Sequence, residues 1–359
     1  MNRTPPAAAS LALLLAINLF NYIDRQVLAA VEPHISKEFF PEGGHRADLW
    51  MGALAPAFMV SYMLTAPVFG WLADRMRRWV LIGVGVVLWS LASGGSGLAP
   101  KIAALLGLSA VGVLLATRMF VGIGEAAYGP AAPTIISDLY PVEKRGRKLA
   151  WFYLAIPVGS ALGYVLGGQV AAIAPSWRWA FYVVVPPGLL LGALCFLMRE
   201  PRRGLSDAGS THRVATLADV RILLRTPSYV YDVLGMTAMT FAVGGLGFWM
   251  PHYITEFRMH ADPATETGHK VLGHVNTTFG AITVVAGLVA TLAGGWLGDR
   301  LKPRLPGSYF LISGAGMLIG FPFFVLMMLR PFPEAWVYIF LAEFCLFFNT
   351  GPKIGRAHV

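Results

Sequence analysis

Long apolar runs dominate this chain and constrain its fold more than any other feature. A membrane-spanning helix needs about 20 predominantly apolar residues to cross roughly 30 Å of hydrocarbon. The composition agrees, because 56% of the 359 residues are hydrophobic and only 13% are charged, whereas about a quarter of the residues in soluble domains are charged. We therefore predict an all-α multi-pass membrane protein with ten spans, near residues 10–31, 48–72, 79–98, 105–139, 149–174, 179–198, 229–257, 272–298, 307–329 and 335–352.

A short motif occurs twice, each time at the end of a long apolar run. Residues Gly70–Arg75 read Gly-Trp-Leu-Ala-Asp-Arg, and residues Gly295–Arg300 read Gly-Trp-Leu-Gly-Asp-Arg. Self-similarity at a nearly constant offset indicates an internal duplication, and parallel repeats build one large class of transporters. Two further echoes keep the same order along the chain: Pro33-His34 with Glu38-Phe39 matches Pro251-His252 with Glu256-Phe257, and Gly129-Pro130 matches Gly351-Pro352.

The duplication predicts two parallel-repeat bundles of six helices, of which the second is incomplete. Residues 1–198 supply the N-terminal six-helix bundle, and residues 228–352 supply helices 7–10 of the other bundle. The polar stretch 199–227 is predicted to be a cytoplasmic linker with a short helix near 217–224. Because two helices are missing and residues 353–359 can be translated back into codons that look like a sequencing adapter, we expect a truncated gene model with a non-native tail. A natural short tail is the alternative.

The net charge of +9 is concentrated on alternate loops. By the positive-inside rule these loops are cytoplasmic, which also places the N-terminus inside. Nucleic-acid binding is therefore not needed to explain the basic composition, and we expect a multi-pass protein of the cell (inner or plasma) membrane. The basic loops lie at 75–78, 144–148, 199–225 and 300–304.

Few ionisable residues interrupt the spans, and each is a functional hypothesis. A charged side chain at the centre of a spanning helix costs about 2.5–3.5 kcal/mol on insertion scales, and such residues usually mark a pathway. The first span carries Asp24 and Arg25, the fourth carries Arg118 and Glu125, and the tenth carries Glu343. We assign the four charges of the first and fourth spans to a central cavity and to proton coupling.

One stripe of the first span is polar and predicts a surface that faces this cavity. Asp24 lies about 100° around the helix from Arg25, so the two side chains leave in different directions. We infer that Arg25 and Glu125 face each other across the cavity and that Glu125 takes up and releases protons. A static buried pair that only orders the bundle is the alternative. The stripe consists of Asn18, Asn21, Tyr22 and Arg25.

The repeated motif lies at the cytoplasmic ends of the second and eighth spans. An Asp held against a helix N-terminus, or against an Arg of the facing half, stabilises one orientation of the two halves, and breaking that contact permits the other. An ordinary basic loop would explain the arginines but not the repetition of the whole motif. We predict a cytoplasmic gate formed by Gly70, Asp74, Arg75, Gly295, Asp299 and Arg300.

The motifs give no support for an enzyme or an ATP-driven pump. No nucleophile elbow, phosphate-binding loop or zinc signature occurs in the sequence. We expect no metal, no cofactor and no nucleic-acid partner, and transport energy from a gradient. The expected partners of the monomer are the lipid bilayer, protons and a small amphipathic substrate.

Several motifs agree, in order, with those of the major facilitator superfamily. The two Gly-x3-Asp-Arg loops resemble its signature, and so does Arg118-x3-Gly122-x-Gly124. Within that superfamily, the segments Asn21–Arg25, Arg118–Tyr128 and Ala132–Tyr140 resemble the Spinster family. The first loop departs from the superfamily pattern, because Arg77-Arg78 stands where a Gly often precedes the basic pair.

The resemblance implies a twelve-helix carrier of two bundles that works by alternating access, with helices 1, 4, 7 and 10 lining the cavity. Spinster members move lysophospholipids or sphingosine-type lipids, and the family residues that couple protons to gating match Asp24, Arg25 and Glu125. A general drug or organic-anion carrier of the same fold is the first alternative, and a non-transporting membrane sensor is the second. Candidates for lining the cavity are Asn18, Asn21, Tyr22, Tyr128, Trp249 and Glu343.

Overall fold

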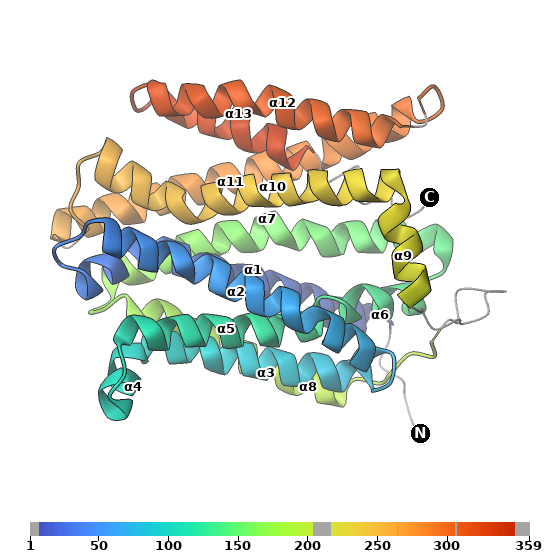
Figure 1. Ribbon diagram of the computed structural model, residues 1–359, viewed down its shortest axis with the longest axis horizontal. Helices are drawn as coiled ribbons and strands as arrows, with labels where there is room; N and C mark the ends of the chain where they lie inside the picture. The colour runs from blue at the N-terminus through green and yellow to red at the C-terminus, as the bar shows by residue number, and fades with distance from the viewer. Residues whose placement is uncertain (1–6, 204–216, 264, 306, 349–359) are drawn as a thin grey trace. The chain divides into compact units, whose positions relative to one another are not determined.

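The computed structural model describes residues 7–203, 217–263, 265–305 and 307–348, and every regular element in these ranges is a helix (Figure 1). Hydrocarbon offers no partner to an unpaired backbone group, and helices satisfy their backbone hydrogen bonds internally. Nine of the described helices are long and apolar enough to cross a membrane, and one shorter apolar helix follows them. The chain is therefore an all-α multi-pass membrane protein.

The helices follow the predicted apolar runs closely. In the first part of the chain they are α1 (Ala7–Phe39), α2 (His45–Ala73), α3 (Arg78–Gly97), α4 (Ala99–Leu106), α5 (Ala110–Tyr128), α6 (Ala131–Leu139), α7 (Val142–Ile173) and α8 (Arg178–Leu197). In the second part they are α9 (Leu217–Arg225), α10 (Pro227–His252), the π-helix η1 (Tyr253–Arg258), α11 (Glu266–Leu301), α12 (Ser308–Leu329) and α13 (Ala335–Phe347).

The predicted fourth span, 105–139, begins too early: the candidate membrane span is Ala110–Leu139, and its helix is interrupted at Gly129-Pro130. Residues 105–106 end α4, a short helix that the apolar pattern did not reveal, and Gly107 closes it in the left-handed conformation with φ 66°. Ser109 then caps α5 by accepting a hydrogen bond from the backbone N–H of Gly112. The pair Gly129-Pro130 separates α5 from α6, because proline lacks the backbone N–H and its ring clashes with the preceding turn.

Two other predictions meet the limits of the described residues. The short helix predicted near 217–224 is present as α9, while much of the predicted linker lies outside the described residues. The tenth span, predicted to reach residue 352, is described as α13 to Phe347. The echo Gly351-Pro352 and the tail 353–359 lie outside the described residues.

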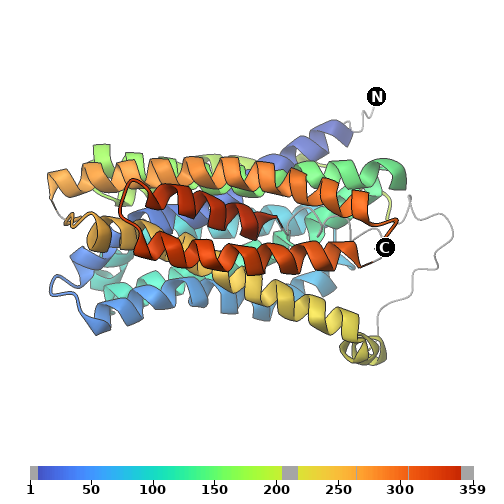
Figure 2. The same ribbon diagram turned by 90° about the horizontal axis from the view of Figure 1, so that it is seen from above.

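The chain forms two compact units, which we describe separately. The first consists of residues 1–206 together with Pro251–Gly280, and the second consists of residues 207–250 together with 281–359. In the first unit α1 packs against α7, and α5 packs against both α2 and α3. Its core is formed by large buried side chains that include Trp79, Trp89, Ile17, Ile135 and Phe152. In the second unit α12 and α13 lie side by side (Figure 2).

Small residues allow α1 and α7 to approach closely. A Cβ atom added to Gly159 would lie 2.6 Å from the carbonyl oxygen of Leu19, and one added to Gly163 would lie 2.5 Å from that of Ile23. Gly167 similarly faces Ala30. Glycine at every fourth position is the pattern by which membrane helices bring their backbones together. This contact holds the polar stripe of α1 in place.

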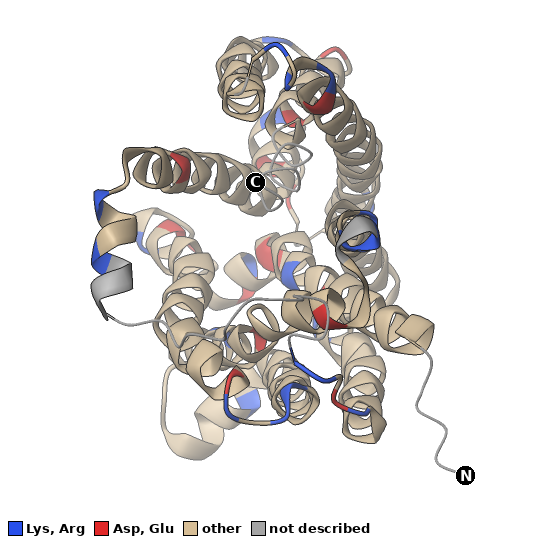
Figure 3. Ribbon diagram, turned by 90° about the vertical axis from the view of Figure 1, so that its right-hand side faces the viewer, with Lys and Arg blue, Asp and Glu red and all other residues tan. Residues whose placement is uncertain are grey.

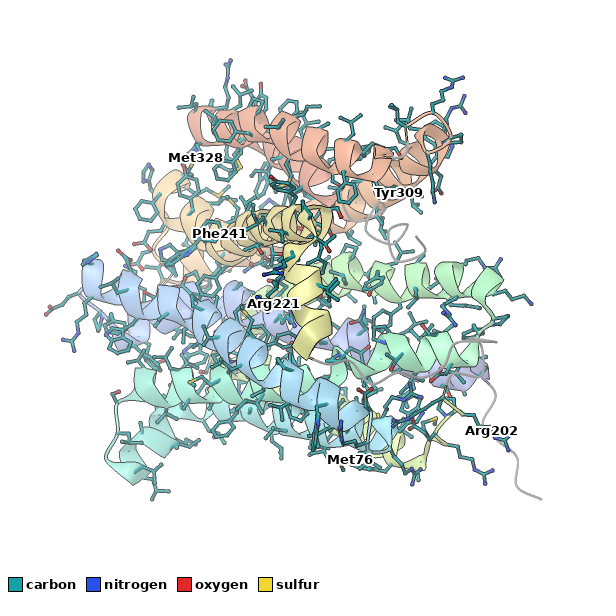
Figure 4. The ribbon with its side chains drawn as sticks, turned by 45° about the vertical axis from the view of Figure 1, so that its right-hand side comes forward. Met76, Arg202, Arg221, Phe241, Tyr309 and Met328 are labelled. Atoms are coloured by element: carbon teal, nitrogen blue, oxygen red, sulfur yellow. The ribbon has the colours of Figure 1, made fainter. Side chains whose placement is uncertain are left out.

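One buried arginine organises the end of the first unit at which α2 ends and α3 begins. The Nη2 atom of Arg78 lies 2.6 Å from Oδ2 of Asp138, and its Nε atom lies 2.6 Å from Oε1 of Glu200. Nearby, Arg203 donates to the backbone carbonyl of Ala73 at 2.8 Å and thereby caps α2. Figure 4 shows Met76 and Arg202 at this same end.

The outer faces of the helices are apolar, as lipid contact requires. Lys, Arg, Asp and Glu are sparse along the spans (Figure 3). Large apolar side chains are instead exposed there; Leu190 is 61% exposed and Leu318 is 78% exposed. Phe241, labelled in Figure 4, is 84% exposed. A soluble protein would rarely expose so much apolar surface.

We expect Gly163→Ala to destabilise the protein. The added methyl group would collide with the backbone of α1, and overpacking of this kind typically costs about 1–3 kcal/mol. Thermal unfolding of the purified protein in one detergent, followed by the loss of monodisperse protein, measures the effect.

Gly314→Ala in α12 is the matched control, because no atom that the structure describes would lie within 4 Å of its Cβ. Both substitutions raise helix propensity by about 1 kcal/mol, so only crowding separates them. Equal thermal midpoints for the two variants would contradict the close α1–α7 contact.

Candidate functional site

A buried ion pair joins α1 to α5 in the first unit. Arg25 donates from Nε to Oε2 of Glu125 at 2.8 Å, and its Nη2 atom contacts the same oxygen. The carboxylate side chain is 1% exposed, while the guanidinium side chain is 23% exposed. The side chain of Asn21 also interacts with this carboxylate, although Oε1 of Glu125 forms no hydrogen bond of normal geometry among the described residues. The pair therefore has one buried acceptor oxygen, beside Asn21, that could take up a proton or accept a hydrogen bond from a ligand.

Aromatic rings hold the guanidinium of Arg25 in position. Its Cζ atom lies 4.7 Å from the ring centre of Phe58 on α2 and 5.0 Å from that of Tyr22 on α1. Rings at these distances attract a cation through their quadrupole. Arg25 is thus supported from two sides while it bonds to Glu125, so it is oriented before any ligand arrives.

The pair lies in the wall of a partly open pocket. The predicted stripe of α1 faces it, as the helical period of 3.6 residues requires. Tyr62, Pro133, Phe152, Tyr153 and Ile156 also contribute, although none of them stood out in the sequence. They come from α2, α6 and α7, and only packing brings those helices to the pair. The lining residues are Asn18, Asn21, Tyr22, Arg25, Tyr62, Glu125, Tyr128, Gly129, Pro133, Phe152, Tyr153 and Ile156.

Two of these lining residues also fasten the bundle. Asn18 donates to the backbone carbonyl of Phe152 at 2.7 Å, which ties α1 to α7. The hydroxyl of Tyr128 donates to the carbonyl of Leu14 at 2.8 Å, which ties α5 to α1. Their polar ends are therefore already engaged, and they present mainly apolar or partly satisfied surfaces to the pocket.

The other two predicted charges form a separate buried cluster between α1, α3 and α5. Asp24 accepts a hydrogen bond from Ser93, and Arg118 donates to Ser96 at 2.6 Å. Each of the two charged residues is 2% exposed, and their charges interact electrostatically. Arg118 also lies 5.4 Å from the ring centre of Phe181. Asp24 and Arg25 thus point to different neighbours, in agreement with their angular offset on α1.

Trp249 and Glu343 belong to the second compact unit. The rings of Trp249 and Phe248 meet edge to face, with centroids 5.4 Å apart. Glu343 is 7% exposed and accepts a hydrogen bond from Thr283 at 3.1 Å. Its Oε2 atom has no hydrogen-bond partner within the described part of the chain. The assignment of these two residues to the cavity stays a prediction.

The two copies of the repeated motif share one local contact. Arg75 lies over the ring of Trp71 at 4.1 Å, and Arg300 lies over the ring of Trp296 at 5.4 Å. Asp74 ends α2 and is exposed. Asp299 accepts a hydrogen bond from Tyr309 at 2.6 Å, within the second unit. The spacing of Trp and Arg on one helix face explains the repeated pair, and the gate itself stays a prediction.

Known proteins resemble the chain over most of its length. Residues 14–352 match the family model of the Major Facilitator Superfamily. Protein spinster homolog 3 of Danio rerio is 38% identical over 347 residues, which cover 95% of this chain and 67% of that protein. Protein spinster homolog 1 of Bos taurus is 36% identical over 353 residues, which cover 96% and 65%. The chain thus spans about two thirds of the length of the curated relatives that it matches.

A solved structure shares the fold. The crystal structure of a bacterial homolog to the human lysosomal transporter Spinster, in an inward-facing and occupied conformation, superimposes with a TM-score of 0.76 at 24% sequence identity. The match covers 98% of this chain and 74% of that chain. The family resemblance predicted from the motifs is confirmed. The chain belongs to the major facilitator superfamily and, within it, to the Spinster family.

Proposed function

We propose that the full-length protein is a secondary active transporter that works by alternating access, couples transport to protons and moves an amphipathic substrate of the lysolipid or sphingolipid type with an anionic head group. The observation that carries this proposal is the Arg25–Glu125 pair, in which a buried carboxylate and its only described guanidinium partner line one pocket. Membership of the superfamily supports the transport class. The pocket chemistry supports the choice of substrate.

The geometry links anion binding to proton binding through one pair of side chains. An anionic head group competes with Glu125 for the donors of Arg25, since charge-assisted hydrogen bonds to a guanidinium are strong. A Glu125 carboxylate left without Arg25 would be a buried, uncompensated charge, which costs several kcal/mol. A proton on the carboxylate removes most of that cost. Substrate and proton therefore favour each other.

The pocket walls suit an amphiphile. Tyr22, Tyr62, Tyr128 and Tyr153 present apolar rings with polar ends, and Phe152 adds a wholly apolar face. Such walls accept a hydrocarbon chain, while Arg25 supplies one charged anchor for a head group. A drug or organic-anion carrier with the same pocket is the alternative outcome of the tests below.

We expect Glu125→Gln to abolish the response of transport to a pH gradient. Glutamine imitates the protonated carboxyl group but cannot release a proton, so substrate exchange should continue while proton-driven accumulation stops. Uptake of a labelled lysophospholipid into liposomes that contain the full-length gene product, with and without a pH gradient, measures both quantities.

Glu266→Gln is the matched control, because this exposed carboxylate pairs with Lys270 at the surface, and uptake by this variant should equal that of the wild type. Equal proton-driven accumulation in Glu125→Gln and the wild type would reduce Glu125 to a structural residue. Inhibition by small hydrophilic anions, without competition by a zwitterionic amphiphile, would favour the organic-anion alternative.

We expect Arg25→Lys to weaken substrate binding without preventing folding. Lysine keeps the charge but lacks the planar fork that meets an anion and stacks on Phe58. The half-saturation concentration should rise at least about tenfold, equivalent to about 1.4 kcal/mol, with little change at the exposed control Arg46→Lys. An unchanged half-saturation concentration would exclude Arg25 as the anion anchor.

We also propose that the N-terminus is cytoplasmic in the inner or plasma membrane, because the basic loops alternate with poorer ones. With Cys195 and Cys345 replaced by alanine, a cysteine at the exposed position Arg202 should react with a membrane-impermeant thiol reagent only after permeabilisation. A cysteine at the exposed position Lys101 should react in intact cells. The reverse pattern would overturn this orientation.

A further inference from the structure

The histidine that ends α10 lies between two carboxylates, one on α1 and the other in η1. The Nδ1 atom of His252 lies 2.8 Å from Oε2 of Glu32, and its Nε2 atom lies 3.1 Å from Oε2 of Glu256 in η1. All three residues belong to the first compact unit. The side chain of Glu32 is 1% exposed and that of His252 is 10% exposed. Both ring nitrogens therefore face a carboxylate oxygen, in a largely buried place.

The two contacts of His252 determine how many protons the three side chains share. Each nitrogen–oxygen contact needs one hydrogen between the two atoms, but a neutral imidazole carries a single N–H and an ionised carboxylate carries none. The bridge therefore consists either of an imidazolium between two carboxylates or of a neutral ring next to one protonated carboxyl group. In both cases it holds one proton more than a neutral histidine beside two ionised glutamates. Removing that proton leaves a nitrogen lone pair facing an oxygen lone pair.

The surroundings contain further charges that bear on the bridge. On α1, Lys37 lies 3.8 Å from Glu256 and 3.9 Å from Asp262. From α2, Asp48 acts electrostatically on His252. His34 of α1 and His269 of α11 meet edge to face at 4.5 Å, and Arg258 bonds to the hydroxyl of Tyr253. Lys37 is thus a cation that partly offsets the charge of Glu256.

The backbone changes its hydrogen bonding directly after His252. Residues Tyr253–Arg258 form a π-helix, and the N–H of Met259 donates to the carbonyl of Ile254 at 2.9 Å. π-helical turns are rare and occur frequently at functional sites. This turn carries Glu256 to the Nε2 side of the ring, so the local backbone completes the bridge.

The echoed sequence in the first repeat lacks such a bridge. There, Glu38 accepts from Nε1 of Trp177 at 2.8 Å and pairs with Arg178. Neither ring nitrogen of His34 has a hydrogen-bond partner among the described residues. The two copies of Pro-His-x3-Glu therefore differ in their contacts, and the first copy offers a matched control for the second.

We propose that Glu32, His252 and Glu256 form a proton-binding site that ties the end of α10 to α1, and that loss of its proton releases the tie. The role in transport rests on the proposed function, because in a carrier with two repeats a contact between α1 of one repeat and α10 of the other must break when that end opens. Glu32 follows Arg25 by seven residues, so it lies on the same face of α1, about 10 Å further along. The site is thus separate from the Arg25–Glu125 pair but shares its helix.

Hydrogen–deuterium exchange of the full-length gene product in lipid nanodiscs tests the tie directly. As the pH rises from about 6 to about 8.5, a range in which histidine sites commonly titrate, the backbone amides of segments 28–38 and 250–260 should become less protected from exchange. After correction for intrinsic exchange, release of one proton changes the open population by up to about tenfold per pH unit. A segment of α5 in the same samples should show no such fall.

The variants distinguish a protonation site from an ordinary contact. In Glu32→Gln the side-chain amide can donate to a neutral ring, so protection should persist at high pH. In His252→Gln no ring titrates, so protection should not depend on pH. Glu38→Gln removes the corresponding carboxylate of the first copy and should keep the wild-type response.

Two results would overturn the proposal. One is that amide protection in the wild type does not change with pH. The other is that protection changes with pH in the same way in the wild type, Glu32→Gln and His252→Gln. If Glu32→Gln fails to fold, His252→Gln alone decides. A pH response without any transport would leave the site standing and refute the proposed function, whereas proton-driven transport without the response would refute the site alone.

Discussion

The neutralisation of charge on α1 is the interaction on which the first unit depends. Three ionisable residues of this helix each have a different partner. Asp24 interacts with the charge of Arg118 on α5 and accepts a hydrogen bond from Ser93 on α3. Arg25 pairs with Glu125 of α5, and Glu32 contacts His252 at the end of α10. A charge left unpaired in hydrocarbon or in a dry core is costly. Movement of α1 away from these neighbours would therefore leave buried charges without their partners, and a change of protonation would reduce that cost.

The packing of α7 makes this arrangement possible. Gly159, Gly163 and Gly167 bring the backbone of α7 against α1, and the polar stripe of α1 lies beside this contact, since a Cβ atom on Gly159 would also lie 2.8 Å from the Cβ atom of Tyr22. Asn18 fastens the two helices through the carbonyl of Phe152. The same close approach turns Phe152, Tyr153 and Ile156 toward the pocket. Glycine spacing on α7 thus helps to decide which side chains of α1 and α7 form the pocket wall.

The proposed carrier has two proton-binding groups that involve α1, and we assign them different roles. Arg25 and Glu125 line a pocket where a substrate anion can compete for the guanidinium. Glu32 and His252 instead join α1 to the end of α10 within the first unit, and neither residue lines that pocket. In the proposed carrier, the first pair would respond to substrate and proton together, and the second would respond to the proton alone. Because both contacts lie on one face of α1, a rotation of that helix affects them together.

The sequence by itself determined the class of fold, the family, the stripe of α1 and the residues Arg25 and Glu125, because apolar length, helical period and motif order are local properties. Only the tertiary structure decided that Asp24 and Arg118 form a cluster apart from the pocket, that Tyr62 and Tyr153 line it, and that His252 meets Glu32. These contacts join residues that are far apart in sequence, with 220 positions between the numbers of Glu32 and His252. No local pattern encodes such a distance, since helix packing and the π-turn after His252 set it.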